Sequence, residues 1–109
     1  MTLEKVVKRD LKDVQYYYLR KGNIAEFVKE TGAPHVLSLV EKYNGYIRAA
    51  SARVYDLYGC LYIQNKTQEA VAIELGCSDE FVRKIHKDML EYFCECIEKD
   101  KEEAGHGRD

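Results

Sequence analysis

The amino-acid sequence predicts an all-α fold, a compact bundle of four to five helices. Apolar residues recur at three- and four-residue steps along most of the chain, and no segment alternates strictly between polar and apolar residues. Hydrophobic residues make up 46% of the 109 residues, which is sufficient for a globular core. We therefore expect one helical domain over residues 1–101, with a helical N-terminal part over residues 1–62, and a disordered tail over residues 102–109.

The N-terminal part contains three helical patterns. The first runs from Leu3 to Arg20 and carries one apolar stripe, formed by Leu3, Val6, Val7, Leu11, Val14 and Tyr18. A short helix is expected from Ile24 to Glu30, ended by Thr31-Gly32-Ala33-Pro34. A long pattern follows from about His35 to Tyr62. Its expected buried face comprises Val36, Leu39, Val40, Tyr43, Ile47, Ala50, Val54, Leu57, Tyr58 and Leu61. The turn dipeptide Asn44-Gly45 either splits this pattern into two helices or is tolerated within one.

The segment from Thr67 to Tyr92, TQEAVAIELGCSDEFVRKIHKDMLEY, predicts two helices joined by a tight turn. Gly76 suits the left-handed conformation of such a turn, and Ser78 suits the N-cap of a helix that reaches about Lys101. Ala72 is small enough for the helices to approach closely. The remaining packing residues are expected inside, namely Val71, Leu75, Cys77, Phe81, Val82, Ile85, Met89, Tyr92, Phe93 and Cys96. These offsets favour a helix-turn-helix over residues 67–93 rather than an ordinary helical hairpin closed by glycine.

Residues 54–93 resemble the fourth region of bacterial sigma factors and related phage transcription regulators. The stretch KRDLKDVQYYYLRK, residues 8–21, is similar to the opening of small phage late-gene activators. The resemblance implies binding to double-stranded promoter DNA and contact with RNA polymerase. It places the base-reading face on Ser78, Asp79, Glu80, Arg83, Lys84 and Lys87. Gln68 would contact a phosphate, Arg83 would reach guanine O6 and N7, and the two lysines would contact phosphates. A homodimer is expected, since one recognition helix reads only a few base pairs.

The charge distribution supports DNA binding less clearly than the resemblance does. The net charge is −2, with an excess of +4 over residues 1–66, −1 over residues 67–87 and −5 over residues 88–109. Asp79 and Glu80 would repel phosphates unless they accept hydrogen bonds from cytosine N4, and they also suit the positive end of a helix dipole. If the two carboxylates serve only the helix dipole, the basic N-terminal helix would have to supply the phosphate contacts, although a basic helix face is more often simply solvated. Its basic residues are Lys5, Lys8, Arg9 and Lys12.

Three functions remain open. The first is a sequence-specific DNA-binding transcription regulator of bacterial or phage origin. The second is a protein-interaction module that keeps the fold and regulates a polymerase, a nuclease or another nucleic-acid-handling protein, as the net charge, the acidic C-terminus and Asp79-Glu80 favour. The third is a small DNA-packaging subunit of a phage.

Other features point away from catalysis and metal binding. The histidines His35, His86 and His106 have no nucleophile or carboxylate at motif spacing, so we expect no enzyme and no cofactor. The four cysteines lack zinc spacing and are expected to be buried and reduced. Tyr16-Tyr17-Tyr18 cannot all pack on one helix face, so at least one should be exposed. No apolar run is long enough to cross a bilayer and no signal peptide is apparent, which predicts a cytoplasmic protein.

Overall fold

The structure is a computed structural model that describes residues 2–20, 29 and 35–106. It contains five α-helices: α1 (Leu3–Arg20), α3 (His35–Ile47), α4 (Ala52–Tyr58), α5 (Gln68–Leu75) and α6 (Asp79–His106). A π-helical segment, η2 (Gly59–Ile63), continues directly from α4. No strand occurs within these residues, which confirms the predicted all-α class. The short helix expected from Ile24 to Glu30 and its stop at Thr31–Pro34 lie outside the described residues, apart from Lys29.

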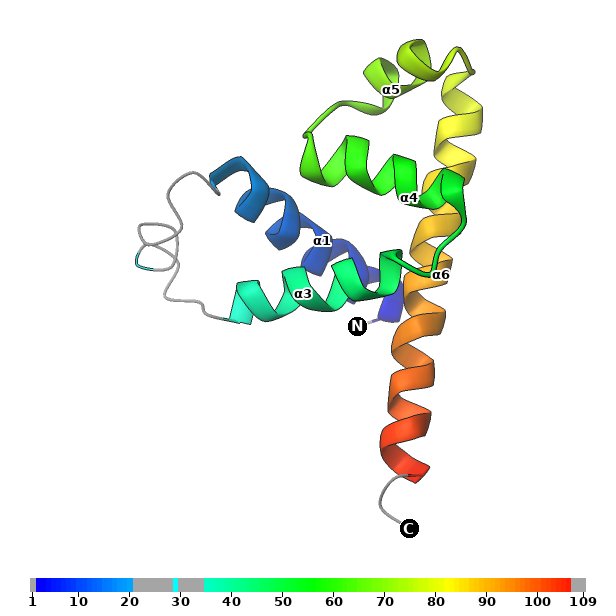
Figure 1. The fold of residues 1–109 in the computed structure, drawn as a ribbon. Helices are drawn as coiled ribbons and strands as arrows, with labels where there is room; N and C mark the ends of the chain where they lie inside the picture. Colours follow the sequence, from blue (N-terminus) through cyan, green and yellow to red (C-terminus); the bar gives the residue numbers. More distant parts are fainter. Residues whose placement is uncertain (1, 21–28, 30–34, 107–109) are drawn as a thin grey trace.

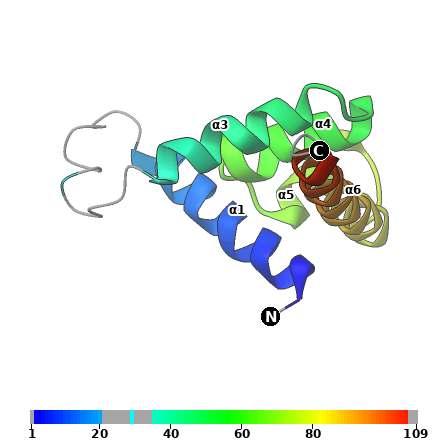
Figure 2. The ribbon, with the colours of Figure 1, turned by 90° about the horizontal axis from the view of Figure 1, so that it is seen from below.

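The long helix α6 is the element around which the others are arranged (Figure 1). It contacts α1, α3, α4 and α5. Viewed from below, along α6, the helices α1, α3 and α4 lie to one side of it (Figure 2). The opposite side of α6 is therefore left to solvent, apart from the ends of the neighbouring helices.

The core lies where α1, α3 and α4 meet the middle of α6. Phe93 is fully buried, and its ring centroid lies 4.9 Å from that of Tyr43 and 5.9 Å from that of Tyr58. The predicted stripes supply most of the other buried residues, namely Val7, Leu11, Val14, Val40, Ile47, Val54, Leu57, Leu61, Val82, Ile85 and Met89. The sequence pattern did not mark Leu90 and Ile97 as buried, yet both belong to this core.

The long pattern from His35 to Tyr62 is split into two helices, but at residues 48–51 rather than at Asn44-Gly45. Asn44 stays helical, and its side chain links three helices: its Nδ2 donates to Tyr18 Oη at 2.8 Å, and its Oδ1 accepts from Tyr58 Oη at 3.0 Å. The second helix starts where Ser51 caps it, since Ser51 Oγ accepts from the Val54 N–H. The side-chain cap thus determines the break, and the turn dipeptide does not.

The remaining boundaries match the sequence except at the C-terminus. α1 covers the predicted range, with Val7, Leu11 and Val14 buried. α6 begins at Asp79 and extends to His106 instead of ending near Lys101, so it includes part of the expected tail. Within the tyrosine triplet of α1, Tyr16 is exposed while the next two rings are half-buried, as predicted.

Candidate nucleic-acid interface

The turn between α5 and α6 is built by side-chain and backbone caps. Thr67 Oγ1 accepts from the Ala70 N–H at 3.1 Å and starts α5. Gly76 ends α5 in the left-handed conformation, with φ 66° and ψ 35°, as predicted. Ser78 Oγ accepts from the Phe81 N–H at 3.1 Å and caps α6. Three residues, 76–78, therefore connect α5 to α6, and both sides of this turn are capped.

α5 packs on α6 through a narrow apolar contact. Val71 and Ala72 are buried, as is Val82 on the facing helix. Leu75, expected on the inward side, is instead 51% exposed, and Ile73 is 82% exposed. The cause is the small contact area: α5 packs mainly against α6 and η2, and two residues fill that contact. Cys77, expected beneath the turn, is half-buried.

All six residues expected to read bases are exposed. Arg83 and Lys87 are four residues apart and share one outward face of α6. Lys84 lies nearer α4, beside Arg53 in a shallow groove of about 300 Å³ that also contains Asp88. Arg53 itself lies over the Phe81 ring, with its guanidinium carbon 5.3 Å from the ring centroid. The three cations thus occupy one sector of α6 of about 100°, with Lys84 at its edge toward α4.

The carboxylates Asp79 and Glu80 occupy the first turn of α6. Both are exposed, and neither forms an ion pair within the described residues. Their position beside unpaired N–H groups stabilises the helix through its dipole. It also places two negative charges one turn before Arg83.

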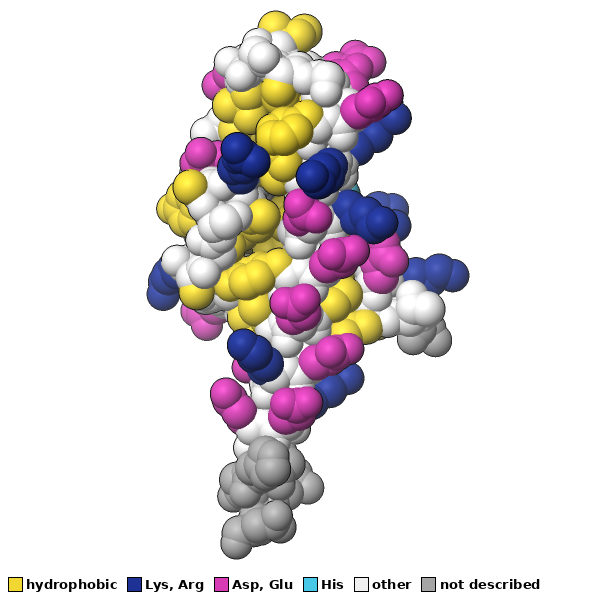
Figure 3. Space-filling view, turned by 90° about the vertical axis from the view of Figure 1, so that its right-hand side faces the viewer, with side chains coloured by type: hydrophobic (Ala, Val, Ile, Leu, Met, Phe, Trp, Pro, Cys, Tyr) yellow, Lys and Arg dark blue, Asp and Glu magenta, His cyan; other side chains and the backbone are white. Residues whose placement is uncertain are grey.

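Charge is divided along the outward face of α6. Lysine and arginine side chains gather toward its N-terminal half, and a line of carboxylates follows below them (Figure 3). Steps of three and four residues align these exposed carboxylates, which are Asp88, Glu91, Glu95, Glu98 and Glu102. A polyanion would therefore be repelled most strongly by the C-terminal half, while in the N-terminal half Asp79 and Glu80 offset part of the positive charge that follows them.

Gln68 does not lie with the six α6 residues. It is half-buried and lines a separate groove of about 380 Å³ between α1, η2, α5 and α6. Three lysines border this groove, namely Lys8, Lys12 and Lys66. We call it the lysine groove. Lys66 was not singled out in the sequence, although its position directly before the Thr67 cap could have drawn attention to it.

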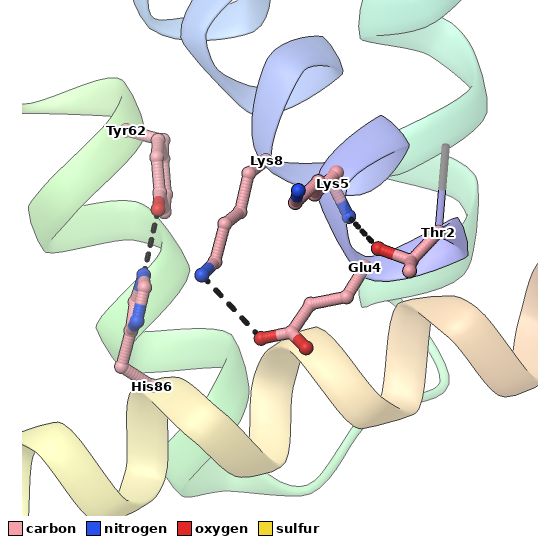
Figure 4. Close-up of polar contacts among 6 residues, drawn as sticks. All are labelled: Thr2, Glu4, Lys5, Lys8, Tyr62 and His86. Carbon is pink, nitrogen blue, oxygen red and sulfur yellow. Dashed lines mark hydrogen bonds and ion pairs between the residues drawn. The ribbon is translucent and has the colours of Figure 1, made fainter.

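One wall of the lysine groove is a tyrosine–histidine pair. Tyr62 Oη and His86 Nε2 are 2.7 Å apart, and the two rings stack at an angle of 22°. Lys8 extends from α1 toward this pair and Glu4 (Figure 4). Burial, and secondarily the charge of Lys8, lower the pKa of His86, while burial raises the pKa of Tyr62 to about 12. Sequence spacing gave no signal for this pair, because its members lie on different elements.

The cysteines are half-buried rather than fully buried, and all four are free. Burial raises the pKa of the Cys94 and Cys96 thiols, which favours the protonated form at neutral pH. Within the described residues, no three His, Cys, Asp or Glu side chains are grouped so that they could hold a metal ion. None of the described helices is both long and apolar enough to span a bilayer.

Comparison of the chain with protein-family models, curated proteins and solved structures finds no match.

Proposed function

We propose that this chain is a sequence-specific DNA-binding transcription regulator, and that α5, the turn and α6 act as a helix-turn-helix. The observation that carries the proposal is the capped turn at Gly76 and Ser78. It fixes α6 at one orientation and leaves the face with Arg83 and Lys87 open to solvent. In proteins with this motif, the second helix enters the major groove with its N-terminal residues against the base edges.

The resemblance to the fourth region of sigma factors supports the same assignment. It favours a bacterial or phage regulator that contacts promoter DNA and RNA polymerase. The roles within the face follow from side-chain chemistry. Arg83 has the forked donors that pair with guanine O6 and N7, whereas Lys87 is a point charge suited to a phosphate. A homodimer would double the number of base pairs read.

Selection of bound duplexes from a random pool, followed by titration of Arg83→Ala and Lys87→Ala, tests the proposal. Arg83→Ala should relax base preference at one position, at a cost of about 1–3 kcal/mol on the selected site. Lys87→Ala should weaken binding to all sequences alike and reduce the salt dependence. Lys101→Ala, near the far end of α6, is the matched control. Failure of the selection to enrich any sequence would refute sequence-specific recognition.

A protein-interaction module is the second candidate, and the exposed side chains of α5 favour it. Ile73 and Leu75 lie largely in solvent, and the acidic line on α6 would suit a basic partner. Purified RNA polymerase is the partner to test first. If the parent chain binds polymerase but no duplex, and Ile73→Ser loses polymerase binding, the chain acts as a protein-interaction module and not as a DNA-binding protein.

A further inference from the structure

The lysine groove has the chemistry of a phosphate-binding surface. Lys8 and Lys12 come from α1, Lys66 from the segment before α5, and Gln68 from the first turn of α5. Residues far apart in sequence are thus brought to one concave surface. Ammonium groups that share a concavity repel one another, and a bound anion would relieve this repulsion.

Not all of this positive charge is already neutralised. Lys8 Nζ lies 3.4 Å from Glu4 Oε1, and Lys66 Nζ lies 2.5 Å from Glu74 Oε2. Both are surface pairs, which contribute little to stability and exchange readily for another anion. Lys12 forms no ion pair within the described part of the chain. The groove therefore retains a net positive charge.

The other polar groups of the groove are mostly engaged. Gln15 Nε2 donates to Leu61 O at 3.2 Å and to Asn65 Oδ1 at 2.8 Å. The His86 and Tyr62 side chains contact each other. The side chains still able to donate to a ligand are thus the three lysines and Gln68. A donor set without a carboxylate of its own fits phosphate rather than a metal ion.

We propose that the lysine groove binds backbone phosphates of the same duplex whose major groove faces α6. This inference rests on the proposed function. His86 and Arg83 are three residues apart on α6, so the groove and the base-reading face adjoin. Lys8 and Lys12 lie one helical turn apart, about 6 Å along α1. Phosphates of one strand are spaced by about 3.4 Å along the DNA axis, so the distance between the two lysines corresponds to about two phosphate steps.

The salt dependence of duplex binding tests this inference. Anisotropy titrations of a labelled random duplex would give the slope of log Kd against log salt for the parent chain and for Lys8→Gln/Lys12→Gln. Each lost phosphate contact reduces the slope by about 1, so the double variant should differ from the parent by about 2. Lys42→Gln/Lys99→Gln, with the same charge change on exposed parts of α3 and α6, should keep the parent slope.

The outcomes separate the two proposals. If the parent chain binds duplex and the Lys8/Lys12 variant keeps its affinity and slope, the groove assignment is overturned while the proposed function stands. If the parent chain does not bind duplex even at low salt, the proposed function fails, and this inference fails with it. Saturable binding of ATP that the double variant abolishes, with duplex binding unchanged, would assign the groove to a free nucleotide and overturn its role on DNA.

Discussion

At the scale of single residues, two glycines differ in backbone conformation. Gly76 has a φ of +66°, which an L side chain adopts only with strain, whereas Gly45 lies inside α3 with ordinary helical geometry. An added Cβ would meet no atom within 4 Å at either position. Any difference between the two alanine variants is therefore due to the backbone.

We predict that Gly76→Ala lowers the free energy of unfolding by about 1–2 kcal/mol because it forces alanine into the left-handed region. Gly45→Ala should raise the free energy of unfolding by about 0.5–1 kcal/mol, since alanine loses less backbone entropy in a helix. Urea unfolding followed by circular dichroism measures both. Equal effects of the two substitutions would contradict the assigned turn.

The pKa of His86 is lowered below its usual 6.5 by burial and by the charge of Lys8. As the pH falls below this value, the unfolded chain binds a proton on His86 before the folded chain does. The free energy of unfolding should therefore decrease on acidification, until the folded chain is protonated as well.

His86→Gln should remove this part of the pH dependence, and His35→Gln, at an exposed position, should leave it intact. The measurement is urea unfolding at about pH 7.5 and about pH 5.5 for the parent and both variants. An unchanged pH dependence in His86→Gln would show that the histidine is not protected from protonation in the folded chain.

At the scale of elements, polar contacts join α3 to α1 and to α6. Asp10 on α1 is only 6% exposed, and its Oδ2 accepts from Tyr43 Oη on α3 at 2.8 Å. Burial and the Asp10 carboxylate raise the pKa of Tyr43, so the phenol remains a donor. Tyr92 Oη on α6 donates to the Tyr46 carbonyl near the end of α3 at 2.6 Å, and the same carbonyl accepts from the Ala49 N–H of the following turn at 3.3 Å.

Tyr43→Phe should lower the free energy of unfolding by about 1–3 kcal/mol, because it removes the 2.8 Å hydrogen bond to the buried Asp10 carboxylate. The double variant Tyr43→Phe/Asp10→Leu should lose less free energy of unfolding than the two single variants lose together, since both polar partners are then removed. Tyr55→Phe, on the exposed side of α4, serves as control. Strict additivity of the Tyr43 and Asp10 changes in thermal or urea unfolding would argue against their coupling.

These elements also show what the sequence could predict. The apolar stripe of α1 and the caps at Thr67 and Ser78 are local signals, because the groups involved lie within four residues of each other. Asn44-Gly45 is tolerated within α3, the second of the two alternatives, and the sequence could not decide between them because Asn44 is held in the helix by Tyr18 and Tyr58, which are distant in sequence. The sequence also did not predict the lysine groove, because the groove is formed by residues of α1 and of the start of α5, which are distant in sequence.

At the scale of the whole molecule, charge is segregated along α6. Its exposed side carries Arg83, Lys84 and Lys87 after the two carboxylates of the first turn, and from Asp88 onward carboxylates outnumber the lysines. A rise of 1.5 Å per residue separates Glu80 from Glu98 by about 27 Å, which exceeds the Debye length of about 10 Å at 0.1 M salt. Only carboxylates near the N-terminal end should therefore oppose a bound duplex.

Glu80→Gln should therefore strengthen binding to random duplex several-fold at about 0.1 M salt, whereas Glu98→Gln should leave it unchanged. The two substitutions remove the same charge from exposed positions of one helix. Anisotropy titrations in parallel would compare them. A gain of equal size in Glu98→Gln would mean that the duplex does not lie at the N-terminal end of α6.

The most direct test of DNA binding is the titration of the parent chain with random duplex over a series of salt concentrations. We expect a Kd within the range of about 10⁻⁴–10⁻⁶ M at physiological salt that weakens steadily as salt increases, because lysine and arginine contacts release counterions. Absence of binding at low salt, or binding that salt does not affect, would contradict the proposed function.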